Sequence, residues 1–339
     1  MLSDKTLIVG PSWVGDMVMA QALFKAIKAR YPNTMIEVLA PEWSRPLTER
    51  MPEVSASIAM PLKHGEMKLK TRYKLGKELS STQYRRCYVL PNSFKSALIP
   101  FWAKVPQRIG WRGEWRYGLL NDVHVLDKQK MPLMVQRYVA LAYDKSQPLP
   151  QKLPRPALVV RQEEVNAALL RYQLSSERPI MVLCPGAEFG PSKRWPESHY
   201  ATLANHYLAQ GWQIWILGSA KDAEVAGAIQ AQTQGQCVDL TGRTALGEAI
   251  DLMSLAKIVV TNDSGLMHIA AALNIPLVAV YGSTDPGFTP PLNENVAIVK
   301  EKIACSPCFE RLCPLGHHEC MQKLPATKVI QAVDMLVSV

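Results

Sequence analysis

Long hydrophobic runs are absent from this sequence of 339 residues. Near the N-terminus, the apolar segment Leu7–Val9 is too short to be the core of a signal peptide. The longest uncharged stretch, 264–284, is interrupted by Asn274 and Pro276, so it indicates a helix, a turn and a strand instead of a membrane span. These absences predict a cytoplasmic protein without a transmembrane anchor.

Two common phosphate-binding motifs are also absent where they would be expected. The first predicted strand, 6–10, leads into the sequence Gly10-Pro-Ser-Trp-Val-Gly-Asp16 at the start of a predicted helix. This segment matches neither the GxGxxG fingerprint of dinucleotide-binding proteins nor the GxxxxGK[ST] phosphate loop. The missing GxGxxG argues against a dehydrogenase.

The seven cysteines are an odd number, and a chain without a secretion signal is not expected to form structural disulfides. Three of them lie in apolar surroundings and are predicted to be buried: Cys87, Cys184 and Cys237. The other four have the spacing C-x2-C-x4-C-x6-C: Cys305, Cys308, Cys313 and Cys320. This spacing offers soft ligands for a structural zinc ion, and the alternative is a reduced cluster that packs a loop. We favour the reduced cluster and expect no metal and no cofactor.

Acidic residues are scarce in the first half of the chain. Residues 1–155 contain 25 Lys and Arg against 12 Asp and Glu, a net charge of +13, whereas residues 156–339 have a net charge of −4. This asymmetry is typical of two domains with different partners. The basic half indicates nucleic acid, a membrane surface or a phosphorylated substrate, with a basic face that has no partner as the alternative. Because no nucleic-acid-binding module is apparent, we expect no nucleic acid partner.

Short apolar segments alternate with helical patterns, which predicts parallel sheets covered by helices on both faces. In the first half, the predicted strands are 6–10, 36–40, 56–60 and 87–91, and the predicted helices are 14–30, 43–50 and 68–80. In the second half, the predicted strands are 180–185, 213–218, 257–262 and 277–281, and the predicted helices are 197–210, 220–232, 246–255 and 266–273.

The segment 147–156 contains four prolines, so it is predicted to be an interdomain linker. The fold class that follows is α/β, with two doubly wound Rossmann-like domains facing a central cleft. The predicted domains are residues 1–155 and residues 156–339.

Ligands bind open α/β sheets beyond the carboxyl ends of the strands, which makes the loops after the strands the candidate sites. Asp16 lies in such a loop, at the start of the first predicted helix. A carboxylate in a first helical turn gains about 0.3–1 kcal/mol from the helix dipole, and this is its structural interpretation. Its functional interpretation is a general base that faces the other domain.

Four loops of the second half carry side chains suited to a nucleotide diphosphate. Two of them place cations, a hydroxyl or uncovered amides beside a helix start, where phosphates bind. The other two offer carboxylates for ribose hydroxyls and a polar turn for a base. The candidates are Ser192, Lys193, Asp222, Glu224, Thr241, Gly242, Asp263, Ser264, Gly265 and His268. Solvated charges, helix caps and a partly buried histidine are the structural alternatives.

Three segments together resemble the ADP-heptose:lipopolysaccharide heptosyltransferases of glycosyltransferase family 9, which have the GT-B fold. They are Gly15-Asp16, Lys193-Arg-Trp-Pro196 and Asn262-Asp-Ser-Gly-Leu-Met-His268. The segments 90–96 and 110–120 and the late cysteine segment resemble the heptosyltransferase II branch of that family. The resemblance covers essentially the whole chain, and the order of the motifs makes it specific.

The resemblance implies a role for each candidate. Asp16 would deprotonate the acceptor hydroxyl, and Lys193 would bind the departing ADP phosphates. The diphosphate would be held at a helix start by Asp263, Ser264 and Gly265, with His268 nearby. The remaining donor contacts would be Asp222 or Glu224 at the ribose, Thr241 and Gly242 at the adenine, and the Ser192 hydroxyl. Acceptor contacts would be Asn92, Lys95, Arg112 and Arg116.

The implied reaction is the inverting transfer of heptose from ADP-L-glycero-D-manno-heptose to the first heptose of the lipopolysaccharide inner core. Such a transfer needs a base at the acceptor and positive charge at the leaving diphosphate. The resemblance implies a reaction without a metal ion. In agreement, the sequence has no Asp-x-Asp pair, which binds a divalent metal in other glycosyltransferases. The basic segments 63–77 and 102–116 would meet the phosphorylated acceptor, heptosyl-Kdo2-lipid A, and the cytoplasmic face of the inner membrane.

Three alternatives stay open. A sugar-nucleotide epimerase of the same fold would need no lipid acceptor and no basic domain. A heptosyltransferase acting at another inner-core position would use the same donor. The third alternative is a nucleotide-binding protein that has no catalytic activity, in which Asp16 would have no catalytic role.

Overall fold

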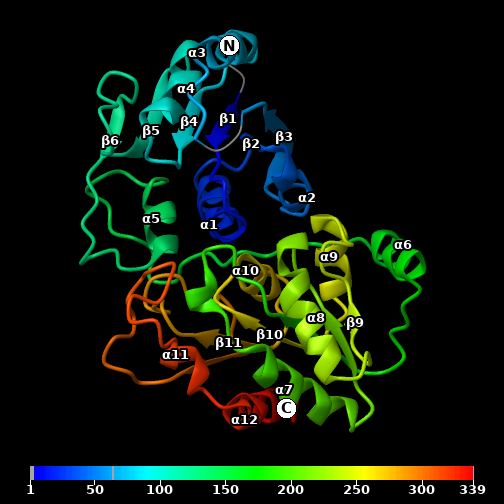
Figure 1. Cartoon of the computed structure of the whole chain (residues 1–339). Coiled ribbons are helices and arrows are strands. Elements are labelled where there is room, and N and C mark those ends of the chain that lie inside the picture. The colour runs from blue at the N-terminus through cyan, green and yellow to red at the C-terminus, as the bar shows by residue number, and fades with distance from the viewer. Residues whose placement is uncertain (1–3, 63–64, 339) are drawn as a thin grey trace. The chain divides into compact units, whose positions relative to one another are not determined.

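The computed structural model describes residues 4–62 and 65–338, which divide after Leu158 into two compact units (Figure 1). Each unit contains a parallel six-stranded sheet flanked by helices. This confirms the predicted α/β class with two doubly wound, Rossmann-like halves. The proline-rich segment 147–156 carries neither helix nor strand and lies just before the division.

The first unit has the strand order β3-β2-β1-β4-β5-β6. Its strands are β1 (Lys5–Val9), β2 (Met35–Pro41), β3 (Val54–Met60), β4 (Arg86–Val89), β5 (Gln107–Trp111) and β6 (Asp122–His124). Its helices are α1 (Val14–Arg30), α2 (Arg45–Thr48), α3 (Leu69–Ser80), α4 (Leu98–Trp102) and α5 (Met134–Ala140), with 3-10 turns η1 (Glu42–Ser44) and η2 (Phe94–Ala97). Helix α5 packs against α1, which opens at the end of β1.

The second unit has the strand order β12-β11-β10-β7-β8-β9. Its strands are β7 (Ile180–Cys184), β8 (Gln213–Ile216), β9 (Val238–Asp239), β10 (Ile258–Asn262), β11 (Leu277–Tyr281) and β12 (Val296–Lys300). Its helices are α6 (Gln162–Tyr172), α7 (Glu197–Leu208), α8 (Ala223–Gln232), α9 (Leu246–Met253), α10 (Gly265–Ala272), α11 (Glu319–Gln322) and α12 (Ala326–Val337), with 3-10 turns η3 (Pro191–Lys193) and η4 (Ala220–Asp222).

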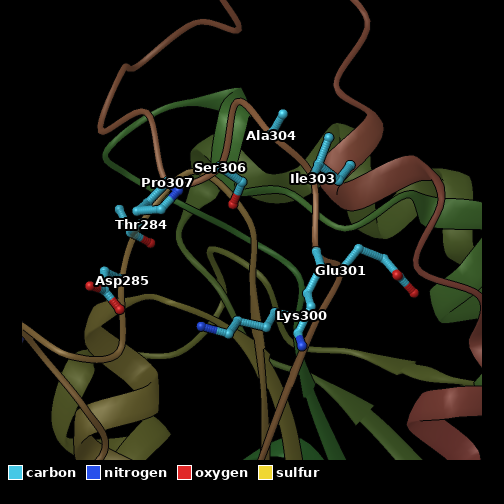
Figure 2. A pocket seen from close by; sticks show the side chains of 9 residues that line it. Thr284, Asp285, Lys300, Glu301, Ile303, Ala304, Ser306 and Pro307 are labelled. Atoms are coloured by element: carbon cyan, nitrogen blue, oxygen red, sulfur yellow. The ribbon is translucent and has the colours of Figure 1, made fainter.

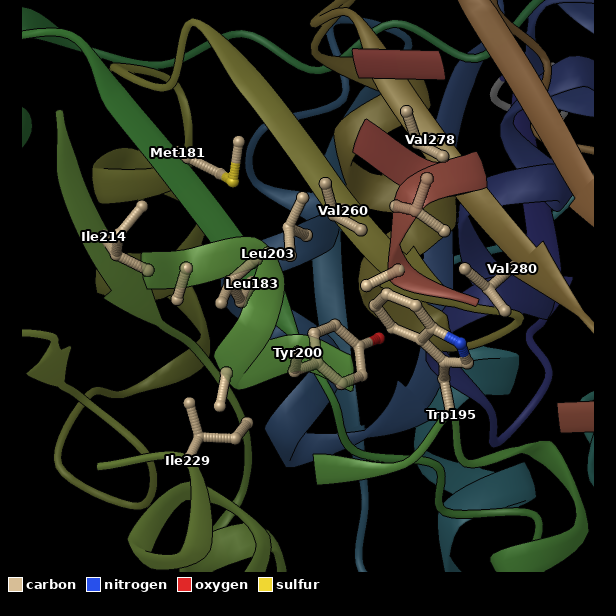
Figure 3. Packing of buried hydrophobic residues seen from close by; sticks show 14 of the residues in the cluster. Met181, Leu183, Trp195, Tyr200, Leu203, Ile214, Ile229, Val260, Val278 and Val280 are labelled. Atoms are coloured by element: carbon tan, nitrogen blue, oxygen red, sulfur yellow. The ribbon is translucent and has the colours of Figure 1, made fainter. Parts of the chain in front are cut away.

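The core of the second unit lies between one face of its sheet and helices α7, α8 and α12 (Figure 3). Every residue of β7, β10 and β11 is buried, as expected for central parallel strands covered on both faces. Trp195 and Tyr200 fill the end of this core nearest the loop after β7, with ring centroids 4.8 Å apart. Large buried side chains therefore fix the loop that carries the candidate phosphate ligand Lys193.

Several elements differ from the sequence-based expectation. Strands β5, β6, β9 and β12 extend the sheets beyond the predicted strands. Strands β6 and β9 have three and two residues, too few for a periodic pattern. The expected helix 43–50 is a 3-10 turn followed by the four-residue helix α2, with Pro46 in its first turn. Helices α4, α5, α6, α11 and α12 were also not predicted.

Two expectations on composition can be followed in the structure. The cysteines predicted to be buried, Cys87, Cys184 and Cys237, are buried. No helix among the described residues is both long and apolar enough to cross a membrane. Residues 63 and 64, which begin the basic segment 63–77, lie outside the described residues.

Candidate active site

The centre of the second unit's site is a largely buried ion pair between two loops. Lys193 closes the 3-10 turn η3 after β7, and Asp263 follows β10. The Lys193 Nζ atom lies 2.5 Å from Asp263 Oδ2, and the two side chains are only 13% and 5% exposed. The Thr284 hydroxyl, after β11, donates to the same carboxylate oxygen at 2.6 Å. The ends of three strands, β7, β10 and β11, thus meet at the Asp263 carboxylate. Thr284 was not among the site residues predicted from the sequence.

Buried Asn262 holds these strand ends in place. Its Oδ1 atom accepts hydrogen bonds from the Trp195 backbone at 3.1 Å and from the Tyr200 hydroxyl at 3.0 Å, and its Nδ2 donates to the Pro185 carbonyl at 2.7 Å. One amide therefore links β10, the end of β7 and the loop that contains Lys193. Asn262 belongs to the motif Asn262–His268, but its place at the end of an apolar strand gave no sign of these bonds.

The Lys193 ammonium group also lies over the ring of Phe189, 4.9 Å from its centroid. An aromatic face attracts a cation, so the ring adds to the orientation of the lysine. The ammonium group is consequently held by both an anion and an aromatic ring.

Helix α10 starts directly beside this ion pair. Ser264 is its N-cap with extended backbone, and the Ser264 hydroxyl lies 3.3 Å from Thr261 Oγ1 instead of capping the helix amides. Gly265 is the first helical residue and has no side chain to cover those amides. This geometry suits a phosphate group, which gains both from free N–H groups and from the helix dipole.

His268 is buried one turn into α10, at 5% exposure. The pKa of His268 is lowered to about 4, chiefly by burial; the Asp263 charge opposes this shift and the Lys193 charge adds to it. The imidazole is therefore neutral near pH 7. It can offer an N–H group to a ligand but not a positive charge.

Ser192 has a different position from the one expected. Its side chain is buried, and its hydroxyl donates to the Glu310 carbonyl at 2.5 Å and lies 3.1 Å from Ser283 Oγ. Its backbone N–H donates to the Arg311 carbonyl. We therefore assign Ser192 to positioning the Lys193 loop against the cysteine-containing segment, whereas the sequence analysis expected a hydroxyl offered to the donor.

The two candidate ribose ligands occupy different environments. Asp222 is 8% exposed and accepts hydrogen bonds on Oδ2 from the backbone N–H and hydroxyl of Ser219, at 2.9 and 2.8 Å. A Cβ atom added at Gly186, after β7, would collide with its carboxylate. Glu224 is exposed on α8. Of the two carboxylates, Asp222 is thus the one that lies at the strand ends. The sequence alone did not distinguish Asp222 from Glu224.

The adenine candidates lie next to Asp222. The Gly242 N–H donates to the Gly218 carbonyl at 3.0 Å, and Gly242 has a φ of +66°, which favours glycine. Thr241 is held by Asp239, whose Oδ1 accepts from the Thr241 backbone and hydroxyl at 2.9 and 2.6 Å. The structure therefore brings Asp222, Thr241 and Gly242 together at the ends of β8 and β9.

In the first unit, Asp16 is in the first turn of α1 and is half-buried. Tyr138, from α5, hydrogen-bonds to its carboxylate. Burial, together with the charge and hydrogen bond of Asp16, raises the pKa of Tyr138 well above its usual range, so Tyr138 keeps its proton. Tyr138 was not predicted as a partner of Asp16, because α5 was not predicted.

The four acceptor candidates divide into two kinds. Arg116 is buried, and its guanidinium donates to the carbonyls of Pro91 and Trp111 at 2.7 and 2.5 Å and to Asn92 Oδ1 at 3.2 Å. Arg116 thus holds the loops together instead of facing solvent, which differs from the expected acceptor contact.

The other acceptor candidates are accessible. Asn92 and Arg112 are exposed, and Lys95 is half-buried in η2. The loop that Arg116 supports also exposes two large aromatic side chains, Trp115 at 86% and Tyr117 at 66%. Polar and aromatic groups therefore share one surface loop.

The late cysteines are unbridged and half-buried. Within residues 4–62 and 65–338, no three His, Cys, Asp or Glu side chains gather closely enough to hold a metal ion. We therefore assign no ligand set to the cysteine segment.

The sequence matches a known protein family and several curated relatives. The family model described as "Glycosyltransferase family 9 (heptosyltransferase)" matches residues 72–319. The chain is 49% identical to "Lipopolysaccharide heptosyltransferase 2" of Escherichia coli K12 over 341 residues, 98% of each chain. It is 50% identical to "Lipooligosaccharide heptosyltransferase 2" of Haemophilus influenzae over 305 residues, 87% of this chain and 88% of the relative.

Solved structures give the same result. The structure of the E. coli ADP-heptose lipopolysaccharide heptosyltransferase II superposes with a TM-score of 0.89 at 48% identity, covering 98% of each chain. A family 9 glycosyltransferase from Veillonella parvula has the same fold, with a TM-score of 0.83 at 18% identity. The family resemblance and the GT-B fold expected from the sequence are thereby confirmed. The chain belongs to glycosyltransferase family 9, and it is a glycosyltransferase.

Proposed function

We propose that this enzyme is an inverting heptosyltransferase that moves heptose from ADP-L-glycero-D-manno-heptose to the first heptose of the lipopolysaccharide inner core. Relatives named lipopolysaccharide heptosyltransferase 2, aligned along nearly the whole chain, support this substrate pair. The observation that carries the proposal is the Lys193–Asp263 pair at the start of α10, because it provides a fixed cation and free amides for a leaving diphosphate.

In the proposed mechanism, the second unit binds the donor. Lys193 and the first amides of α10 hold the diphosphate, Asp222 accepts from the ribose hydroxyls, and Thr241 and Gly242 flank the adenine. As the bond between the anomeric carbon and the phosphate oxygen breaks, negative charge develops on ADP. The ammonium group and the helix start stabilise that charge, which lowers the barrier to departure.

The first unit supplies the base and binds the acceptor. Asp16 takes the proton of the acceptor hydroxyl while that oxygen forms the new bond to the anomeric carbon, on the face opposite the leaving ADP. A single displacement of this kind inverts the anomeric configuration. Tyr138 holds the Asp16 carboxylate in place through its hydrogen bond. A positioned general base contributes about 10²–10⁴-fold to such a reaction.

Acceptor-dependent release of ADP tests the proposal. The purified enzyme with ADP-heptose should release ADP when heptosyl-Kdo2-lipid A is added, and should release far less with Kdo2-lipid A, which lacks the first heptose. Equal release with both acceptors would favour transfer at another inner-core position. Conversion of the donor without any acceptor would instead favour the epimerase, an alternative that family 9 membership does not support.

We further propose that the enzyme works in the cytoplasm, at the cytoplasmic face of the inner membrane. The net charge of +13 in residues 1–155 and the exposed Trp115 and Tyr117 support contact with an anionic lipid surface. In sedimentation with anionic vesicles, Trp115→Ala and Tyr117→Ala should reduce binding. Leu170→Ala, at an 82% exposed position in the second unit, is the matched control. Wild-type sedimentation by both aromatic variants would contradict the membrane contact.

A further inference from the structure

The order of the strands in the second sheet arranges its binding groups along one edge. The candidate nucleoside ligands follow β8 and β9, whereas Lys193 and Asp263 follow β7 and β10. Strands β11 and β12 continue the sheet on the side away from the nucleoside. Because neighbouring strands are about 4.8 Å apart, the ends of β11 and β12 lie about 5–10 Å beyond the diphosphate position.

A pocket of about 290 Å³ lies at these two strand ends (Figure 2). Thr284 and Asp285 line one side after β11, while Lys300 and Lys302 come from the end of β12 and the segment that follows it. Ser306 and Pro307, from the cysteine-containing segment, close it above in the view of Figure 2. The volume lies just below the range for ligand pockets, about 300–1,000 Å³, and suits a single sugar ring.

The pocket shares a residue with the diphosphate site and has a fixed wall. Thr284 lines the pocket and donates to Asp263 at 2.6 Å, so the two sites adjoin. The Ser306 hydroxyl donates to the Gly282 carbonyl at 2.6 Å, and the Phe309 N–H donates to the Ser283 carbonyl at 2.7 Å. These bonds tie the cysteine-containing segment to the end of β11, so this wall of the pocket is held in place.

The charges in the pocket favour a polyhydroxylated ligand. Within the described chain, the ammonium groups of Lys300 and Lys302 have neither a hydrogen-bond nor an ion-pair partner. The Glu301 carboxylate is paired with Lys328, whereas Asp285 accepts from the Gly287 N–H at 2.9 Å on Oδ1. The two ammonium groups would attract a phosphate group while the Asp285 carboxylate would repel it, and an apolar group would leave these polar atoms unpaired. Sugar hydroxyls both donate and accept, so they match this mixture.

We infer that this pocket is a glycosyl-binding subsite, in which Asp285, Lys300 and Lys302 bind sugar hydroxyls beside the diphosphate position. The inference rests on the proposed transfer from a sugar nucleotide. Two sugars have the required chemistry: the heptosyl group of the donor and the terminal heptose of the acceptor. The experiment below separates these sources.

The test compares Asp285→Asn and Lys300→Met with the wild-type enzyme, and Lys257→Met is the control. Lys257 is exposed at the amino end of β10, away from the pocket-lining strand ends. Calorimetry measures the Kd of ADP and of ADP-heptose without acceptor, and steady-state kinetics measures the KM of heptosyl-Kdo2-lipid A. Thermal melting checks that each variant is folded. If Lys300→Met does not fold, the isosteric variant Asp285→Asn still tests the inference.

Loss of one hydrogen bond to a charged group should weaken the sugar ligand about tenfold or more. A raised Kd for ADP-heptose with an unchanged Kd for ADP supports the subsite with the donor as its source. A raised acceptor KM with unchanged donor binding supports it with the acceptor as its source. The inference is overturned if both constants stay at wild-type values or if ADP and ADP-heptose weaken equally. A wild-type enzyme that binds ADP but not ADP-heptose would instead overturn the proposed function.

Discussion

Lys193 and Asp263 form their 2.5 Å ion pair although they follow different strands and are 70 residues apart in the chain. The carboxylate is fixed by Thr284 and the ammonium group rests on Phe189, so the cation is oriented before a phosphate binds. A preorganised cation needs little reorganisation when charge develops on a leaving group. In the proposed mechanism, the pair therefore links the packing of the second unit to the step in which ADP departs.

Lys193→Ala should lower kcat by about 10²–10³, the usual effect of losing one preorganised group that stabilises charge in the transition state. The loss in kcat should exceed the loss in ADP affinity measured by calorimetry, because the contact strengthens as charge develops. Lys257→Ala, at an exposed position, should leave both values unchanged. Wild-type kinetics and ADP binding in Lys193→Ala would mean that this lysine takes no part in catalysis.

Asp16→Asn should lower turnover by about 10²–10⁴ while nucleotide binding is retained, because the acceptor loses its general base. Tyr138→Phe should cause a smaller loss, and it should cause little further loss when combined with Asp16→Asn. Tyr143→Phe, in the same unit, is the control for loss of a tyrosine hydroxyl. Independent, additive effects of the two changes would argue against a positioning role for Tyr138.

Stability should fall as the pH is lowered from about 6.5 to about 4, in part because of His268. Its ordinary pKa is 6.5 and its folded pKa is about 4, so in this range the unfolded chain binds a proton that the folded chain does not. The contribution is on the order of 3 kcal/mol at most. In urea unfolding, His268→Gln should lose less stability across this range than the wild type, and the exposed-site variant His206→Gln should behave like the wild type. An equal loss in all three proteins would refute the assignment.

The KM for the acceptor should rise with salt more steeply than the KM for ADP-heptose. Exposed charges, which dominate residues 1–155, are screened over about 8–10 Å at 0.1–0.15 M salt. Lys193, which is proposed to bind the donor, is 13% exposed and therefore less accessible to counterions. Steady-state kinetics from 25 to 300 mM NaCl, roughly spanning that range, measures both constants. Equal salt dependence of the two would show that the basic half has another purpose.

Purified enzyme should contain well under one equivalent of zinc, and EDTA should leave transfer intact. The expectation follows from the proposed mechanism, in which Lys193 and the start of α10 stabilise the leaving group. Elemental analysis and activity after chelation provide the measurement. Stoichiometric zinc together with activity lost on chelation would show that Cys305, Cys308, Cys313 and Cys320 form a metal site.

Much of the fold could be predicted because its central strands are buried on both faces. Strand β11 and helix α1 have the predicted bounds, since a continuous apolar run and a long helical pattern leave little choice. Short edge elements such as β6 and β9 carry too few residues for a pattern. They form because a neighbouring strand offers partners for backbone hydrogen bonds, and the local sequence does not reveal that neighbour.

The candidate site was only partly predictable for the same reason. Loops at strand ends, with Lys193 and Asp263, follow from position along the chain. The Thr284 bond to Asp263 and the Tyr138 bond to Asp16 depend on packing between distant segments. Sequence also does not distinguish an exposed arginine such as Arg112 from the buried Arg116, because burial depends on the loops that surround it.

We propose above all that this chain transfers one heptose with inversion to a heptosylated acceptor. Its most direct test is mass spectrometry and NMR of the product formed from ADP-heptose and heptosyl-Kdo2-lipid A. We expect an acceptor heavier by one heptosyl residue, linked to the first heptose with the anomeric configuration inverted relative to the donor. An unmodified acceptor, or a product that retains the donor's configuration, would contradict it.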